Sequence, residues 1–206
     1  MQRIRFFGVA GASICFLAAC QTTLTVPAEN AHICEIFADN PSWPSHLQRA
    51  SSRWDISRFQ IMAFMYQESR FVSDARPPVV EELSEHEASG AWGYAQATRV
   101  TWEEYLEEIG TDRVSRENFR DSADFIGWYN RRTHIALGIP ETNTVHLYYA
   151  FHEGRGGYQR GTYETPGRAW LREVGKKVEA KEALYRRQSF NCPDSNRKRF
   201  VRPIPR

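Results

Sequence analysis

The segment from Ile56 to Phe71 decides the fold, and it reads Ile-Ser-Arg-Phe-Gln-Ile-Met-Ala-Phe-Met-Tyr-Gln-Glu-Ser-Arg-Phe. Its apolar residues fall on nearly every side of a helix with 3.6 residues per turn. A helix of that kind is buried in the middle of a domain, because it leaves no face for water. No other stretch alternates apolar and polar residues for long enough to predict a strand. The sequence therefore predicts a small, mostly α-helical globule built around this segment.

Four more helices are predicted by the spacing of apolar residues and by capping residues. They begin at Thr101 (in a capping box with Glu104), near Ser115, at Thr142 or Asn143, and at Thr165-Pro166. Gly110 ends the first and Gly138 follows the second, while a glycine-rich turn over Gly154–Tyr158 follows the third. In the last helix Trp170 is predicted to start a buried stripe. The segment Val72–Gly90, with two adjacent prolines and a run of acids, predicts a long loop.

The N-terminus has the composition of a secretion signal. Arg3 and Arg5 precede an uncharged apolar stretch, Phe6–Ala19, which is too short to span a bilayer comfortably. The stretch ends in Leu17-Ala18-Ala19-Cys20, which resembles the lipobox of bacterial lipoproteins. That resemblance implies cleavage before Cys20 and acylation of its sulfur and new amino group. The alternative is an ordinary secretory signal with an incidental cysteine.

These boundaries predict the organisation of the chain. We expect a signal peptide over residues 1–19, a lipidated tether over 20–30, one catalytic domain over 31–195 and a basic tail over 196–206. Gln21 after the cysteine resembles lipoproteins sent to the outer membrane, which predicts a periplasmic protein held there by its lipid. The tail is expected to be a solvated end, with contact to anionic lipid or wall polymer as the alternative.

Charge and cysteine content limit the kinds of partner and of cysteine chemistry that the protein is expected to have. Loss of Arg3 and Arg5 with the signal leaves 25 basic and 25 acidic side chains, a balance that argues against nucleic acid as a partner. Of the four cysteines, only Cys34 and Cys192 remain once the signal is removed and Cys20 is acylated. An oxidising envelope favours a disulfide between them. No residues are spaced as ligands for a metal site, so neither a metal nor another cofactor is expected.

Glu68 is the candidate catalytic residue. It lies near the C-terminal end of the apolar helix, where burial and the negative end of the helix dipole both disfavour its ionised form. A raised pKa is what a general acid working near neutrality needs. The alternative is a glutamate that reaches water or pairs with Arg70 at the helix end.

Three segments together resemble the lytic transglycosylases. Gln67–Phe71, with its Glu-Ser pair, is similar to their first motif. Gly90–Gln96 (Gly-Ala-Trp-Gly-Tyr-Ala-Gln) is similar to the second, Gly-x-x-Gly-Leu-Met-Gln. Ala150–Gly154 (Ala-Phe-His-Glu-Gly) stands where the third, Ala-Tyr-Asn-Ala-Gly, is expected. The likeness covers about residues 54–158, and it extends toward Cys34 and Cys192 in a lipoprotein branch that also has flanking cysteines.

The resemblance implies a fold and a reaction. The family fold is a lysozyme-like helical domain of the goose type, with a groove for the peptidoglycan glycan strand. Glu68 would protonate the bond between N-acetylmuramic acid and N-acetylglucosamine, and then take a proton from the C6 hydroxyl to leave a 1,6-anhydro end. Membrane contact would come through the lipid anchor alone. The residues implied to bind substrate or to support the groove are Ser69, Trp92, Tyr94, Gln96, Tyr149, His152 and Glu153.

The chain departs from the family pattern in its second and third motifs. Tyr94 and Ala95 replace the leucine and methionine that line the family's groove. Phe151 lacks the hydroxyl of the third-motif tyrosine, and Tyr149 is a candidate to replace it. Two other functions stay open at this point: a hydrolytic muramidase that positions water with Glu153, Asp74 or Glu81, and a peptidoglycan-binding lipoprotein without catalysis.

Overall fold

The computed structural model describes residues 26–77 and 90–192. The predicted signal, the predicted acylation site Cys20, most of the predicted loop with Glu81, and the basic tail lie outside these residues. The described part contains seven α-helices and two 3₁₀ turns, and its only extended pairing is a single bridge between Trp92 and Ala97. The prediction of a mostly α-helical globule is confirmed.

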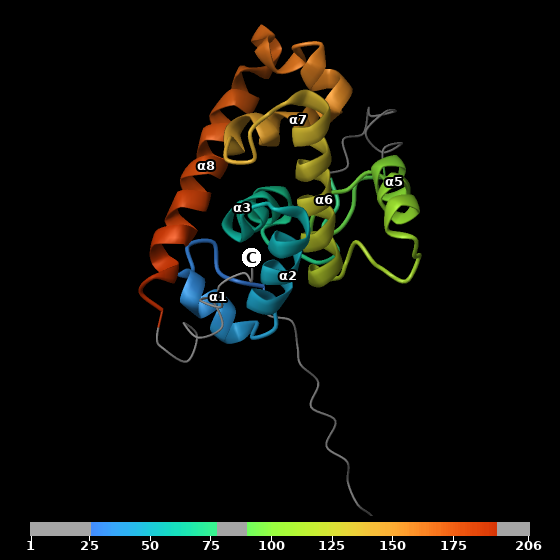
Figure 1. The fold of residues 1–206 in the computed structure, drawn as a ribbon. Helices are drawn as coiled ribbons and strands as arrows, with labels where there is room; N and C mark the ends of the chain where they lie inside the picture. Colours follow the sequence, from blue (N-terminus) through green and yellow to red (C-terminus); the bar gives the residue numbers. More distant parts are fainter. Residues whose placement is uncertain (1–25, 78–89, 193–206) are drawn as a thin grey trace, which may run out of the picture.

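Helix α3 (Arg58–Ser69) forms the centre of the molecule, as Figure 1 shows. Ser57 caps its N-terminus by accepting a hydrogen bond from the backbone N–H of Gln60. Nine of its residues are buried, because helices α2, α6 and α8 pack on different sides of it. The all-round apolar pattern thus predicted both the helix and its central place.

The N-terminal helices close one end of the domain. Helix α1 (Ile33–Asp39) begins at a capping box of His32 and Glu35, and α2 (Trp43–Trp54) packs mainly against α6. A disulfide joins Cys34 to Cys192 with their Cα atoms 5.4 Å apart, which confirms the predicted pairing. This bond ties α1 to the end of α8.

Helices α5 (Arg99–Ile109) and α6 (Phe119–Leu137) differ from the prediction at their starts. The N-cap of α5 is Thr98, not Thr101, and its hydroxyl accepts from the Thr101 backbone N–H. Helix α6 begins after Asn118, whose side chain accepts from the backbone of Arg120, so the predicted start near Ser115 is wrong. Both helices end as predicted, since Gly110 and Gly138 take left-handed conformations there.

Helix α7 (Thr144–Gln159) starts after Asn143, as predicted, and bends at Gly154, where φ is +72° and ψ is 155°. The chain then makes the 3₁₀ turns η1 (Thr162–Glu164) and η2 (Pro166–Arg168) before α8 (Ala169–Ser189). Trp170 is 47 % exposed, so its predicted place in the buried stripe is wrong. Its ring instead lies edge-on to His152, with centroids 5.1 Å apart. Within residues 26–77 and 90–192, none of the helices has the length and hydropathy to cross a membrane.

Candidate active site

Glu68 lies in the last turn of α3, and the backbone that follows it is held in an uncommon conformation. Arg70 and Phe71 both have positive φ, at 53° and 65°. Such conformations cost about 1 kcal/mol or more for residues with a side chain. Burial of Phe71 against Trp43, with ring centroids 5.4 Å apart, offsets this cost. The end of α3, and Glu68 with it, is therefore fixed by packing.

The carboxyl group of Glu68 is set up to hold a proton near neutral pH. The side chain is half-buried, and its Oε1 is covered and makes no hydrogen bond to any described residue. Burial raises the pKa of Glu68 to about 7, although a hydrogen bond from Tyr148 acts in the opposite direction. The described part of the chain therefore leaves the hydrogen-bonding capacity of Oε1 unused.

The hydroxyl group beside Glu68 belongs to Tyr148 of α7. Tyr148 is buried, and burial followed by the charge of Glu68 raises the pKa of its hydroxyl, so the group stays protonated and donates. Tyr149 points elsewhere: its hydroxyl donates to the backbone oxygen of Arg172 at 3.3 Å. Tyr148 is not among the site residues that the sequence predicts. The spacing could have indicated it, because Tyr148 lies four residues before His152 and so on the same face of the helix.

The second motif forms a tight turn that carries Gln96. Gly93 has a φ of +78°, and a Cβ at this position would lie 2.2 Å from the backbone oxygen of Arg116. Only glycine fits there. Gln96 has a φ of 46°, and its Nε2 donates to the backbone oxygens of Ala75 at 2.8 Å and Gly93 at 2.9 Å. The Gln96 side chain thus fixes the turn from within.

Three of the predicted groove residues have other surroundings. Tyr94 is 1 % exposed and lies edge-on to Trp43 and Phe119 in the core, where burial raises its pKa to about 12. Its ring offers no surface to a glycan. Trp92 is half-buried beneath the guanidinium of Arg76, 3.6 Å from the ring centroid. Ser69 is buried and donates to the backbone oxygen of Met65, which supports the helix end.

The third motif lines a cavity of about 250 Å³ together with the second. Its wall residues are Gln96, Ala97, Thr98, Thr101, Phe125, Tyr129, Phe151, His152, Glu153 and Gly154. The ring of Tyr148 connects this cavity to Glu68, because it contacts the His152 ring with centroids 6.5 Å apart. Gln96, His152 and Glu153 are therefore brought together, and Tyr148 lies between their cavity and Glu68.

Glu153 is an ionised, fully paired carboxylate in this cavity. It accepts hydrogen bonds from Thr162 Oγ1 at 2.5 Å and from His152 at 3.2 Å, and it lies 3.0 Å from Arg168 Nε. Burial alone would raise its pKa. The hydrogen bonds from Thr162 and His152 and the charge of Arg168 outweigh burial and hold the pKa of Glu153 below its usual range.

A comparison with protein families decides the identity of the domain. The family model described as transglycosylase SLT domain matches residues 8–192, which is most of the chain. The protein belongs to the transglycosylase SLT domain family. No curated protein matches the chain. Membership of the SLT family supports a function of the lytic transglycosylase type, with the glycan strand of peptidoglycan as substrate.

The charged side chains of the SLT domain do not form a metal site in the part that the structure describes. No three histidine, cysteine, aspartate or glutamate side chains gather there as ligands.

Proposed function

We propose that this SLT domain is a peptidoglycan lytic transglycosylase with Glu68 as its single acid and base. The observation that carries the proposal is the state of Glu68: a pKa of about 7 and a covered Oε1 without a partner in the described chain. A group with this pKa is protonated in a large fraction of molecules at neutral pH, yet loses its proton readily. It can therefore serve first as acid and then as base.

The proposed reaction needs one carboxyl group. Glu68 donates its proton to the oxygen between N-acetylmuramic acid and N-acetylglucosamine as that bond breaks. The resulting carboxylate then takes the proton of the muramyl C6 hydroxyl, whose oxygen attacks C1 and closes the 1,6-anhydro ring. The attack is intramolecular, so it avoids the entropy cost of recruiting water. Tyr148 keeps the carboxyl oriented through its hydrogen bond.

The surroundings of Glu153 argue against the hydrolytic muramidase. That enzyme would need a second carboxylate to activate water. Glu153 is held by Thr162, His152 and Arg168, and its lowered pKa makes it a weak base. Against the purely binding lipoprotein, Tyr148 supplies a hydroxyl near Glu68 although Phe151 has none.

The product distinguishes these functions. Digestion of purified sacculi should release muropeptides that end in 1,6-anhydro-N-acetylmuramic acid, lighter by one water than lysozyme products. Borohydride treatment should leave these ends unchanged, because an anhydro end has no aldehyde to reduce. Mass spectrometry of the digest measures both properties. Reducible N-acetylmuramic acid as the main end would establish the muramidase, and intact sacculi would establish the binding protein.

We also propose that the protein is a lipoprotein of the outer membrane, held through Cys20. The support is the sequence alone: the apolar run up to Ala19 and the polar residues that follow Cys20. Exchange of Cys20 for Ala should move the protein from the membrane fraction to the soluble periplasm, because the acyl chains provide the anchoring energy. Fractionation of cells with a salt wash tests this. A Cys20→Ala protein that still sediments with membranes would rule out the lipid anchor.

A further inference from the structure

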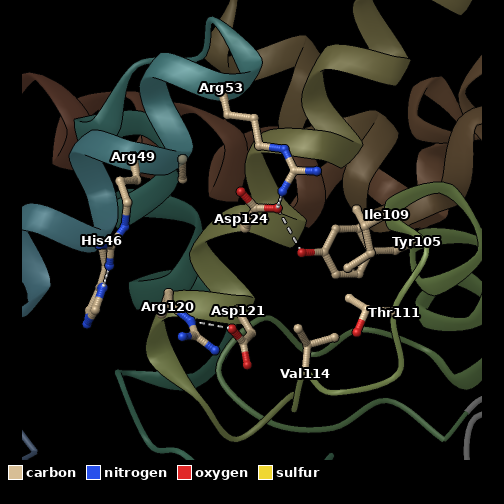
Figure 2. Close-up of a pocket in the computed structure, with 11 residues that line it drawn as sticks. His46, Arg49, Arg53, Tyr105, Ile109, Thr111, Val114, Arg120, Asp121 and Asp124 are labelled. Atoms are coloured by element: carbon tan, nitrogen blue, oxygen red, sulfur yellow. Dashed lines mark hydrogen bonds and ion pairs between the residues drawn. The ribbon is translucent and has the colours of Figure 1, made fainter.

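A second cavity, of about 300 Å³, lies between α2, α5, α6 and the loop that joins the last two helices. Figure 2 shows its wall, in which Arg53 of α2 lies beside Asp124, Arg120 of α6 lies beside Asp121, and Arg49 lies beside His46. The wall residues are His46, Arg49, Arg53, Arg120, Asp121 and Asp124, and the uncharged part is Ala50, Tyr105, Ile109, Thr111 and Val114. None of these residues takes part in the proposed cleavage.

The two aspartates are already paired and act as supports for the arginines. Asp124 accepts from Arg53 Nη1 at 3.0 Å and from the Tyr105 hydroxyl at 2.8 Å. The Asp124 side chain is 18 % exposed, whereas that of Arg53 is 51 % exposed. The carboxylate is thus the more buried member of the pair, and the arginine side chain is half exposed to solvent. Figure 2 shows Arg53 and Tyr105 approaching Asp124 from different sides.

The second pair repeats this arrangement at the start of α6. Asp121 accepts from Arg120 Nε at 2.7 Å and from the backbone N–H of Ser115 at 3.0 Å. The side chain of Asp121 is only 5 % exposed, and that of Arg120 is 52 % exposed. Each aspartate accepts two hydrogen bonds within the protein, one of them from the arginine that it holds at the cavity mouth.

Arg49 adds a positive charge that no carboxylate of the described chain balances. It is exposed on α2, and its guanidinium donates to Nδ1 of His46. Burial lowers the pKa of His46, and the charges of Arg49 and Arg120 lower it further, while Asp121 acts in the opposite direction. The local field is therefore positive on this wall despite the two aspartates, which favours an anionic ligand.

The apolar part of the cavity wall, its floor, favours a ligand that has apolar groups as well as a negative charge. Ile109 and Val114 are half-buried and present apolar surface to the cavity. A fitting ligand therefore carries a carboxylate together with small apolar groups. Guanidinium groups bind carboxylates through paired charge-assisted hydrogen bonds.

We propose that this cavity binds the peptide stem of peptidoglycan, with a stem carboxylate on Arg49 and alanine methyl groups on the floor. The inference rests on the proposed function, because the peptide is attached to the muramic acid of the glycan that Glu68 would cleave. Stem peptides are short and carry several free carboxylates and alanines. Their chemistry matches both the charge and the floor of this cavity.

The two cavities have neighbouring wall residues on α5 and α6. On α5, Thr101 lines the cavity near Glu68 and Tyr105 lines the second one, about 6 Å further along the helix axis. On α6, Phe125 and Asp124 line the respective cavities as adjacent residues. An extended stem of four residues reaches up to about 14 Å. The proposal places the glycan in one cavity and its stem in the other.

The test is a binding measurement on the full mature protein that does not depend on cleavage. The probe is the tetrapeptide stem released from sacculi by an amidase, titrated by isothermal calorimetry. Arg49→Gln should bind it about tenfold more weakly than the wild type, since one charge-assisted pair is lost. Arg187→Gln is the matched control, because Arg187 is an exposed arginine on α8 outside this cavity. The pair Arg49→Glu and Arg187→Glu repeats the comparison with a reversed charge.

Equal binding by the wild type and Arg49→Gln, with unchanged unfolding temperatures, would overturn the stem site. So would Arg49-dependent binding to phosphatidylglycerol vesicles without binding of the stem, which would assign the arginines to a lipid surface. Digestion of sacculi by the wild type is measured in parallel. Digestion without stem binding refutes this site and retains the enzyme, whereas stem binding without digestion retains the site and refutes the enzyme.

Discussion

Exchange of Glu68 for Gln should reduce the release of muropeptides from sacculi by at least about a thousandfold. The amide keeps the shape of the side chain but can neither donate a proton to the glycosidic oxygen nor accept one from the C6 hydroxyl. Both steps of the proposed reaction are lost together, because a single group performs them. Binding of glycan should persist, since the cavity wall of Gln96, His152 and Glu153 is untouched.

The same variant has a predicted effect on stability that separates it from a folding defect. The pKa of Glu68 is about 7 in the folded protein against an ordinary value of 4.5. Ionisation therefore costs the folded state more than the unfolded state, and wild-type stability falls as pH rises through this window. Glutamine does not ionise. The stability of Glu68→Gln relative to the wild type should thus increase between about pH 4.5 and pH 7, by up to about 3 kcal/mol.

Denaturant unfolding of both proteins at pH 4.5 and pH 8 measures this difference. Glu107→Gln is the control, because Glu107 is an exposed glutamate on α5. It should match the wild type in cleavage and in the pH dependence of stability. Cleavage that survives in Glu68→Gln would move the chemistry to another residue. A stability difference that is the same at both pH values would show that the pKa of Glu68 is not raised.

The features of the fold that the sequence predicts are those carried by long patterns. Helix α3 followed from apolar residues on all its sides, and the disulfide followed from the two cysteines that the predicted processing would leave. The start of α5 was misplaced because two threonines compete for the cap. The hydroxyls of Thr98 and Thr101 lie within hydrogen-bonding distance of each other. A threonine can cap a helix at either position, and in the structure Thr98 is the cap.

The candidate site was predictable in its motifs and less so in its side-chain directions. Tyr148 and Tyr149 are adjacent and both buried, because α7 is covered on one side by α6 and on another by α8. A burial pattern cannot tell which of the two hydroxyls faces Glu68 when neither faces water. Trp170 was misplaced for a related reason: two 3₁₀ turns precede α8, and its ring packs on His152 rather than on the core.

No pattern in the sequence predicts the second cavity. Its charged wall comes from α2 and α6, and its floor comes in part from α5 and the loop after it. Arg49, Arg53 and Arg120 look like ordinary solvated charges on two amphipathic helices. The packing of α2 on α6 brings them to one cavity. Asp124 and Asp121 then hold Arg53 and Arg120 there through ion pairs.

Removal of the Cys34–Cys192 disulfide should cause the largest loss of stability of the changes considered. The two cysteines are 158 residues apart, so the bond closes nearly the whole described domain into one loop. In the chain-entropy model a loop of this length restricts the unfolded chain by about 5 kcal/mol, an upper value because residual unfolded structure reduces it. For a domain of this size the unfolding temperature should fall by roughly 10 °C or more.

The folded state should retain its core after the bond is broken. Helix α1 is also attached through buried Ile33, Ile36 and Phe37, and the backbone N–H of Ile33 donates to Gln188 of α8 at 3.1 Å. Cys34→Ala/Cys192→Ala is therefore expected to fold, with α1 becoming the first part to open because it holds only seven residues. Hydrogen exchange should show faster exchange in α1 than in α3.

Thermal unfolding of the double-alanine variant and of the wild type, each with and without reductant, tests the disulfide. Reductant should lower the unfolding temperature of the wild type to that of the variant and leave the variant unchanged. Two cysteines that react with a thiol reagent in the denatured, unreduced mature protein would show that the bond is absent. An equal unfolding temperature in all four samples, together with no reactive thiols in the unreduced protein, would instead show that the bond forms but adds no stability. Helix α1 and α8 would then be held together by their apolar contacts and the hydrogen bond to Gln188.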